Sequence, residues 1–124
     1  MYLLDSNIPI DMLRGYPAAV TLVEELRIAG PLRVSILTRF EVLAGMRQRE
    51  AAGTYTLLDS FETLPVTPPI VDVAAEFWRR YREAGRTLSR FDTIIAATAV
   101  VEDLTLVTRN VRDYPMPEVR LYRW

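Results

Sequence analysis

A regular alternation of short apolar runs with helical patterns constrains the fold of this chain more than any other feature of its sequence. The short runs occupy residues 2–4, 32–36, 64–66, 104–108 and 119–122. The helical patterns occupy residues 8–14, 17–28, 38–46, 51–61, 69–85 and 92–101. Strands that alternate with helices favour a parallel sheet with helices on both of its faces. We therefore expect a three-layer α/β/α sandwich, and the length of 124 residues fits one domain over positions 1–124.

The distribution of apolar residues predicts neither a membrane span nor an export signal. No segment has the roughly 18 uninterrupted apolar residues that a transmembrane helix requires. The N-terminal residues include no basic stretch and no small-residue cleavage site, both of which mark a secretory signal peptide. We therefore expect a cytoplasmic protein with no membrane partner.

The amino-acid composition excludes several kinds of chemistry. The chain has no Cys, no His and no Lys, and all fifteen of its basic residues are Arg. Zinc sites built from Cys or His are excluded, as are Ser–His and Cys–His nucleophiles, Schiff-base lysines and P-loops. If the protein is an enzyme, carboxylates and a hard divalent cation are the tools that remain.

Three acidic residues stand at equivalent places in the alternation. Asp5 directly follows the first apolar run, Glu41 lies about one turn into the helix after the second run, and Asp92 begins the apolar helix that leads to residues 104–108. A further candidate segment, residues 110–113, follows that run. In a doubly wound parallel sheet all these places lie at the carboxyl edge, where ligands bind. We therefore expect the acids to converge in space.

Most of these acids also have a structural explanation. Thr38 and Glu41 fit a capping box at a helix start, and Ser89 and Asp92 repeat the pattern. An acid in the first turn of a helix also interacts favourably with the helix dipole. Asp113 lies in an Arg-Asp-Tyr-Pro segment that is typical of a plain turn.

Convergence of the carboxylates favours a metal site over these explanations. Asp5 could cap the first helix, but a charge beside a buried strand is costly to desolvate unless it is paired or bound to a metal. Carboxylates within about 4–6 Å of one another repel and raise each other's pKa unless a cation intervenes. A divalent ion neutralises them, lowers the pKa of a bound water and stabilises charge on a phosphoryl oxygen. Such a site suits phosphodiester hydrolysis without His.

Four segments of the chain together resemble a known family. They are residues 3–7 (LLDSN), 38–45 (TRFEVLAG), 92–99 (DTIIAATA) and 106–114 (LVTRNVRDY). In order, spacing and total length they are similar to the motifs of PIN-domain ribonucleases, and more narrowly to those of VapC-type toxins from bacterial toxin–antitoxin pairs. The resemblance covers essentially the whole chain.

The resemblance implies a PIN-like fold and a metal-dependent endoribonuclease that cleaves phosphodiester bonds in tRNA or another structured RNA. By the family pattern Asp5, Glu41 and Asp92 hold Mg²⁺ or Mn²⁺, and Asn7 and Thr108 support the site. The implied partner is a VapB-like antitoxin whose C-terminal segment covers the cleft and whose N-terminal part binds operator DNA. A homodimer is the implied assembly.

The chain departs from the family pattern near its C-terminal end. Family members often carry an Asp directly after the Thr-Arg of the last motif, where this chain has Asn110, and the nearest acid is Asp113. Either residue could complete the site. Within the resemblance we assign metal binding mainly to Asp5 and Asp92, activation of the attacking water to Glu41, and an outer or second-metal role to Asp113.

The arginines are unevenly distributed, although the net charge is only −1. Five of them fall within residues 79–90 and four within residues 109–123. Because arginine makes bidentate contacts to phosphate, Arg86, Arg90 and Arg109 are candidates to bind RNA phosphates at the rim of the site. Ordinary solvated helix faces are the alternative explanation.

Two other functions compete with the nuclease. A receiver-like phosphoacceptor also gathers acids at strand ends, but it normally needs a Lys near the phosphate, and the chain has none. A catalytically inactive PIN-like module that binds RNA or protein is the second alternative. Heat released on titration with Mn²⁺ distinguishes a working site from such a module.

Overall fold

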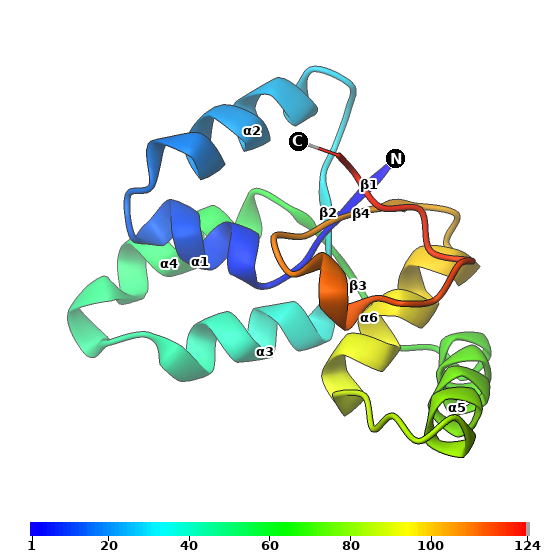
Figure 1. Ribbon diagram of the computed structural model, residues 1–124. Coiled ribbons are helices and arrows are strands. Elements are labelled where there is room, and N and C mark those ends of the chain that lie inside the picture. The colour runs from blue at the N-terminus through cyan, green and yellow to red at the C-terminus, as the bar shows by residue number, and fades with distance from the viewer. Residues whose placement is uncertain (124) are drawn as a thin grey trace.

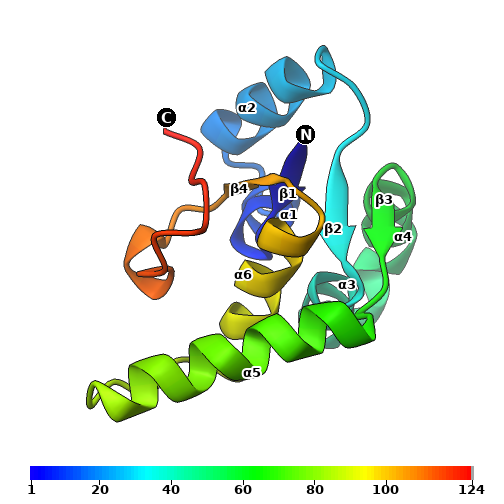
Figure 2. The same ribbon diagram turned by 90° about the vertical axis from the view of Figure 1, so that its right-hand side faces the viewer.

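The structure, a computed structural model that describes residues 1–123, contains a parallel sheet of four short strands. The strands are β1 (Tyr2–Leu4), β2 (Arg33–Ser35), β3 (Glu62–Leu64) and β4 (Thr105–Val107). Their order is β3-β2-β1-β4, and every neighbouring pair is parallel. Figure 2 shows this order from right to left. The carboxyl ends of β1 and β4 therefore lie side by side.

Helices connect the strands on both faces of the sheet. They are α1 (Asn7–Leu13), α2 (Pro17–Arg27), α3 (Ile36–Gly45), α4 (Ala51–Asp59), α5 (Pro68–Glu83) and α6 (Arg90–Val101), with short 3₁₀ helices at Gln48–Glu50 and Val111–Asp113. Pro17 and Pro68 begin α2 and α5, since the fixed φ of proline suits the first helical turn. Across residues 1–123, no helix is both long enough and apolar enough to cross a bilayer.

The sheet separates two hydrophobic clusters, because successive residues of a strand point to opposite faces. Leu3 and Leu106 pack with α5 and α6, whereas Leu4 and Val107 pack with α1 and α2. Figure 1 shows these two pairs of helices on opposite sides of the strands. The expected three-layer α/β/α arrangement with a parallel central sheet is confirmed.

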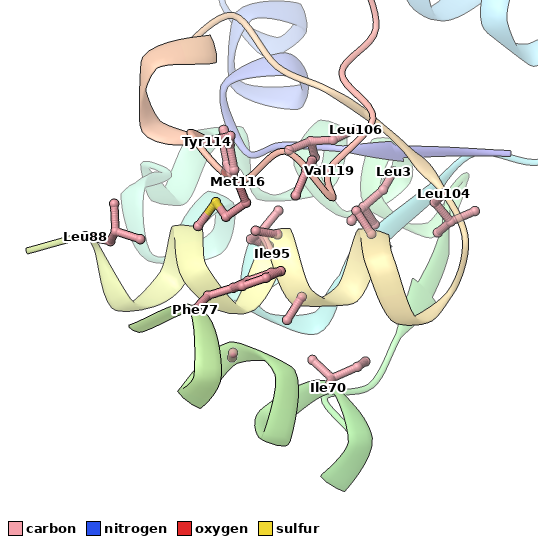
Figure 3. Close-up of a cluster of buried hydrophobic side chains, with 14 residues drawn as sticks. Leu3, Ile70, Phe77, Leu88, Ile95, Leu104, Leu106, Tyr114, Met116 and Val119 are labelled. Carbon is pink, nitrogen blue, oxygen red and sulfur yellow. The ribbon is translucent and has the colours of Figure 1, made fainter. Parts of the chain in front are cut away.

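Helix α6 is the central element of the first cluster. Ile95 is fully buried and belongs to the same cluster as Leu3 of the sheet and Phe77 of α5 (Figure 3). Tyr114 and Met116, from the segment after β4, close the same cluster. Because α6 is buried over most of its length, the position of its first turn is fixed relative to the sheet.

The predicted second and fourth strands are each one residue too long at both ends, and two other predicted strands differ more. The third strand ends at Leu64, two residues earlier than predicted, because Pro65 has no N–H to donate to a neighbouring strand. The strand predicted at residues 119–122 is reduced to a single parallel bridge between Leu121 and Leu106. Backbone hydrogen bonds of 2.8 Å link Leu106 to the residues on either side of Leu121.

The capping box suggested for Thr38 and Glu41 is wrong. Helix α3 begins at Ile36, and its N-cap is Ser35, whose hydroxyl accepts a hydrogen bond from the Leu37 N–H at 3.1 Å. Thr38 lies inside the helix with its side chain buried. Glu41 lies beyond the first turn, so its carboxylate is not used at the helix start.

Candidate active site

The ends of β1 and β4 border an open cleft of about 380 Å³. The residues that line it include all four predicted acids: Asp5, Glu41, Asp92 and Asp113. The chain runs from β1 through β2 to β3 in one direction and then places β4 on the other side of β1. A reversal of this kind is where parallel α/β sheets bind ligands. The fold thus brings acids from four separate segments to that place.

Asp5 is held by the sheet and by its own hydrogen bonds. Its N–H donates to the carbonyl of Val107 at 2.9 Å, so its backbone continues β1 alongside β4. The residue is only 4% exposed. Oδ1 accepts from Ser6 N at 2.8 Å, and Oδ2 accepts from Thr108 Oγ1 at 2.8 Å and from Asn7 Nδ2 at 3.3 Å. These hydrogen bonds replace those that the buried carboxylate would make with water, and they fix its orientation.

Asn7 and Thr108 connect the two ends of the chain beneath the cleft. Thr108 Oγ1 accepts hydrogen bonds from Asn7 Nδ2 at 3.2 Å and from Asn110 N at 3.0 Å. Asn7 Oδ1 accepts a bond from Arg109 N at 3.2 Å. Both side chains are buried. They therefore hold the loop after β4 against the start of α1, and their supporting role in the site stays a prediction from the family pattern.

Glu41 reaches the cleft from the second turn of α3 and is partly buried. Burial raises the pKa of Glu41 above its ordinary value, and the nearby charge of Asp5 raises it further. A hydrogen bond with the Ser6 side chain acts in the opposite direction. The Glu41 carboxylate thus binds a proton more tightly than an ordinary glutamate, partly because of the charge of Asp5.

Asp92 occupies the first turn of α6. Ser89 is the N-cap of this helix, and its hydroxyl accepts a hydrogen bond from Asp92 N at 3.3 Å, so the predicted cap at Ser89 is present. Burial raises the pKa of Asp92 to about 6, with further contributions from the charges of Asp5, Asp113 and Glu41. The other acids of the cleft are therefore close enough to disfavour a negative charge on Asp92.

Both candidates for the last site position, Asn110 and Asp113, line the cleft. Asn110 donates its backbone N–H to Thr108, which ties it to the buried network. Asp113 lies in the exposed 3₁₀ turn after β4, and its charge contributes to the raised pKa of Asp92. The Asp113 carboxylate thus acts on Asp92 electrostatically from its position in the turn, and its role in the site stays a prediction.

Tyr114 is a site residue that the sequence did not suggest. Its hydroxyl donates to Asp92 Oδ1 at 3.4 Å, and its ring belongs to the hydrophobic cluster of α6. Burial and the charges of Asp5 and Asp92 hold the pKa of Tyr114 above its ordinary value, so it stays a neutral donor. In the sequence, the one indication that Tyr114 belongs to the site is its position directly after Asp113.

The donor set of the cleft suits a hard divalent cation. Its candidate ligands are carboxylates, and oxygen is the ligand that Mg²⁺ and Mn²⁺ prefer. A cation would relieve the repulsion that, after burial, contributes to the raised pKa of Glu41 and of Asp92. Within residues 1–123, no three acidic side chains are placed so that all could ligate one ion. Mg²⁺ takes few carboxylates directly and keeps several waters, so the spacing fits an ion held partly through water.

The three arginines proposed for the rim have different environments. Arg109 lines the cleft and pairs with Asp11. Arg86 donates to the backbone carbonyl of Arg112. Arg90 lies over the ring of Trp78, 5.3 Å from its centroid. Of the three, only Arg109 borders the acids in the part of the chain that the structure describes.

Comparison with known proteins identifies close relatives of the chain. Residues 2–116 match the PIN domain family. Ribonuclease VapC19 of Mycobacterium tuberculosis is 42% identical over 117 residues, which are 94% of this chain and 94% of that protein. A toxin–antitoxin complex from Klebsiella pneumoniae contains a chain with a TM-score of 0.80 and 29% identity, covering 100% of both chains.

A further solved structure shows the fold alone. It is VapBC2 from Rickettsia felis bound to a DNA fragment from its promoter, and it matches with a TM-score of 0.85 and 20% identity. The match covers 99% of this chain and 98% of that one. The arrangement of strands and helices is therefore shared over nearly the whole length.

Proposed function

Because the chain belongs to the PIN-domain family, we propose that it is an endoribonuclease that requires Mg²⁺ or Mn²⁺ and acts as the toxin of a toxin–antitoxin pair. The similarity to a named ribonuclease extends over nearly the full length of both proteins. This supports a shared activity on RNA and a single PIN-like domain over residues 1–124. We propose tRNA or another structured RNA as its substrate.

The observation that carries the proposal is the gathering of four carboxylates in one cleft at the switch point of the sheet. The pKa of Glu41 and that of Asp92 are both raised, and one cause in each case is the charge of Asp5. Without Cys, His or Lys in the chain, no other set of side chains in the cleft offers a nucleophile or base of comparable strength. Metal-dependent hydrolysis is the reaction that such a site suits.

We propose that Asp5 and Asp92 are the principal ligands of the cation, with Glu41 as a further ligand and Asp113 in an outer role. When bound, the cation neutralises the carboxylates, acidifies a water molecule and stabilises charge on the phosphoryl oxygens. The Ser6, Asn7 and Thr108 hydrogen bonds orient Asp5. Tyr114 orients Asp92 by donating to its Oδ1.

Glu41 is the candidate general base. The pKa of Glu41 is raised towards neutral pH, so its carboxylate is a stronger base and accepts a proton from water more readily. The attacking water loses a proton to the Glu41 carboxylate, its oxygen bonds to phosphorus, and the bond from phosphorus to the leaving oxygen breaks. A proton from solvent completes the leaving group.

The toxin role rests on the relatives. The Klebsiella pneumoniae structure is described as a toxin–antitoxin complex, which supports a VapB-like antitoxin as the partner of this chain. We propose that the antitoxin inhibits cleavage, that the chain forms a homodimer, and that it acts in the cytoplasm, where its RNA substrates are found.

Incubation of the purified chain with total RNA tests the activity. We expect cuts at a small number of positions with Mg²⁺ or Mn²⁺, located by sequencing the new RNA ends, and no cuts in EDTA. Cleavage that is unchanged in EDTA would contradict the metal requirement. Absence of both cleavage and heat on Mn²⁺ titration would favour the inactive binding module.

Expression of the chain with and without its neighbouring reading frame tests the partner. Growth arrest by the chain alone, relieved by a short neighbouring protein that copurifies with it, is the expected result. Arrest that no neighbouring gene relieves would contradict the toxin–antitoxin assignment while leaving the nuclease assignment intact.

A further inference from the structure

One buried acid lies beside the cleft but is not among its proposed metal ligands. Asp11 projects from α1, its side chain is only 5% exposed, and it forms a bidentate pair with Arg109. Arg109 Nε lies 2.9 Å from Asp11 Oδ2, and Nη2 donates to Asp11 Oδ1 at 3.1 Å. A buried carboxylate needs such a partner, and the two parallel bonds fix the plane of the guanidinium.

Arg109 is held at the cleft by its backbone as well as by its side chain. Its N–H donates to Asn7 Oδ1 at 3.2 Å, and the amide nitrogen of Asn7 donates in turn to Asp5 Oδ2 at 3.3 Å. The position of Arg109 is thus linked through one residue to Asp5. A ligand bound to this guanidinium would therefore lie at a fixed position relative to Asp5 and the acidic site.

The pairing with Asp11 leaves part of the guanidinium available. Arginine has five N–H donors, and the bonds to Asp11 use Nε and one hydrogen of Nη2. The Arg109 side chain is 53% exposed and lines the same cleft as Asp5 and Asp92. The guanidinium therefore keeps donors that the Asp11 pair does not use, on a side chain that borders the space where a phosphate would lie.

A second arginine borders the cleft from the same helix as Asp11. Arg14 is exposed at the C-terminal end of α1 and lines the cleft together with Arg109. Within residues 1–123 these are the only two cationic side chains that line the cleft, together with four acidic ones. An RNA strand is repelled by the acids of the cleft, and these two guanidinium groups are the side chains of its lining that attract a phosphate.

We propose that Arg109 and Arg14 form a phosphate-binding subsite of the cleft, and that Asp11 is the residue that positions Arg109 in it. The occupant is a phosphate of the RNA chain adjacent to the one that is cleaved. This inference rests on the proposed ribonuclease function. It adds a site that holds the RNA and a buried residue that acts only through Arg109.

The effect of Asp11→Asn on RNA binding tests the positioning role, because charge and positioning predict opposite results. Removing a carboxylate makes the cleft less negative, so if Asp11 only neutralised Arg109, the variant would bind RNA more tightly. If Asp11 positions Arg109, the variant binds more weakly despite its more favourable charge. The probe is a labelled single-stranded RNA oligonucleotide, titrated with the full chain in EDTA so that binding is measured without cleavage.

We expect Arg109→Gln and Asp11→Asn each to raise the Kd by about three- to tenfold. Arg109→Gln should also make the negative slope of the logarithm of the binding constant against the logarithm of the salt concentration shallower by about 0.7. This is the value for one phosphate contact to a single strand. In the Arg109→Gln background, Asp11→Asn should weaken binding no further. With Mg²⁺, both variants should raise KM more than they lower kcat.

An exposed pair outside the cleft provides the matched control. Arg120 Nη1 lies 2.8 Å from Asp103 Oδ1, and neither residue lines the cleft. Arg120→Gln and Asp103→Asn should leave the Kd and the salt dependence unchanged. If Asp11→Asn fails to fold, Arg109→Lys carries the test, since lysine keeps the charge but cannot make the bidentate pair, and we expect it to bind like Arg109→Gln.

The outcomes separate this inference from the function on which it rests. If the wild-type chain cleaves RNA while Arg109→Gln binds like the Arg120→Gln control, the subsite is wrong and the nuclease assignment stands. Tighter binding by Asp11→Asn would overturn the positioning role. A wild-type chain that neither binds nor cleaves RNA would overturn both the subsite and the proposed function.

Discussion

Thr108 and Asp5 lie 103 positions apart in the chain, yet the hydroxyl of Thr108 donates a 2.8 Å hydrogen bond to Oδ2 of Asp5. The same hydroxyl accepts bonds from Asn7 and from the backbone of Asn110. One buried oxygen atom thus connects the first acid of the site with the loop after β4. The geometry of the cleft depends on how this atom is placed.

Thr108→Val should disturb the site without removing a charge. Valine keeps the shape of threonine but leaves three polar groups without this partner, and we expect a loss of about 1–3 kcal/mol in the free energy of unfolding. Cleavage should fall as well, because Asp5 loses its orientation. Urea unfolding and single-turnover cleavage measure the two effects. Thr98→Val is the control, since that buried hydroxyl bonds only within α6, and normal cleavage by Thr108→Val would refute the role.

Glu41→Gln should lower kcat by about 10²–10⁴-fold, the usual range for loss of a general base. Glutamine preserves the size of the side chain but cannot accept the proton of the attacking water. In the absence of metal its stability should be unchanged or higher, because repulsion with Asp5 is removed. Glu25→Gln, on the exposed side of α2, should leave kcat as in the wild type. A Glu41→Gln enzyme with normal kcat would exclude Glu41 as the base.

The metal-free protein should lose stability as the pH rises through about 6. The pKa of Asp92 is raised from 3.8 to about 6 on folding, and that of Glu41 is raised as well. For an acid with a raised pKa, the stabilising contribution is complete below its unfolded value of 3.8 and disappears as the pH passes its folded value.

Comparison of the wild type with Asp92→Asn isolates this contribution from other titrating groups. In EDTA, the melting temperature of the wild type relative to the variant should be higher at about pH 5 than at about pH 7.5. Thermal melts followed by circular dichroism give the difference. A difference that is the same at both pH values would show that Asp92 does not titrate in this range.

Mg²⁺ or Mn²⁺ should restore the stability that repulsion removes at neutral pH. An ion that binds only the folded state, at a free concentration about 100 times its Kd, adds about 2.7 kcal/mol to the free energy of unfolding. The gain in melting temperature should be largely lost in Asp92→Asn and reduced at about pH 5, where part of the Asp92 population is protonated. A gain of the same size in wild type and variant would place the ion elsewhere.

The acids that the alternation of strands and helices places at the carboxyl edge of the sheet could be predicted from the sequence. Asp5, Glu41 and Asp92 follow from the alternation of strands and helices, because in a parallel sheet every strand ends at the same edge. The buried helix of residues 92–101 was equally visible, since it is apolar on all sides, and α6 is observed there.

Features that depend on three-dimensional contacts could not be predicted. Tyr114 and Asp11 contact the cleft residues Asp92 and Arg109, which lie far away in the sequence, and no local pattern distinguishes them. The capping prediction for Thr38 was wrong because Ser35, at the strand end, already caps the helix. Two acceptable capping residues three positions apart are ambiguous until the strand boundary is known.

The most direct test of the account is the effect of Asp5→Asn on RNA cleavage, measured together with the melting temperature in EDTA. The substitution keeps the size of the side chain and removes its charge. We predict that cleavage with Mg²⁺ falls by orders of magnitude while the melting temperature without metal changes by no more than a few degrees. Cleavage equal to that of the wild type, or a variant that no longer folds, would contradict the assignment of Asp5 as the first ligand of a metal-dependent nuclease site.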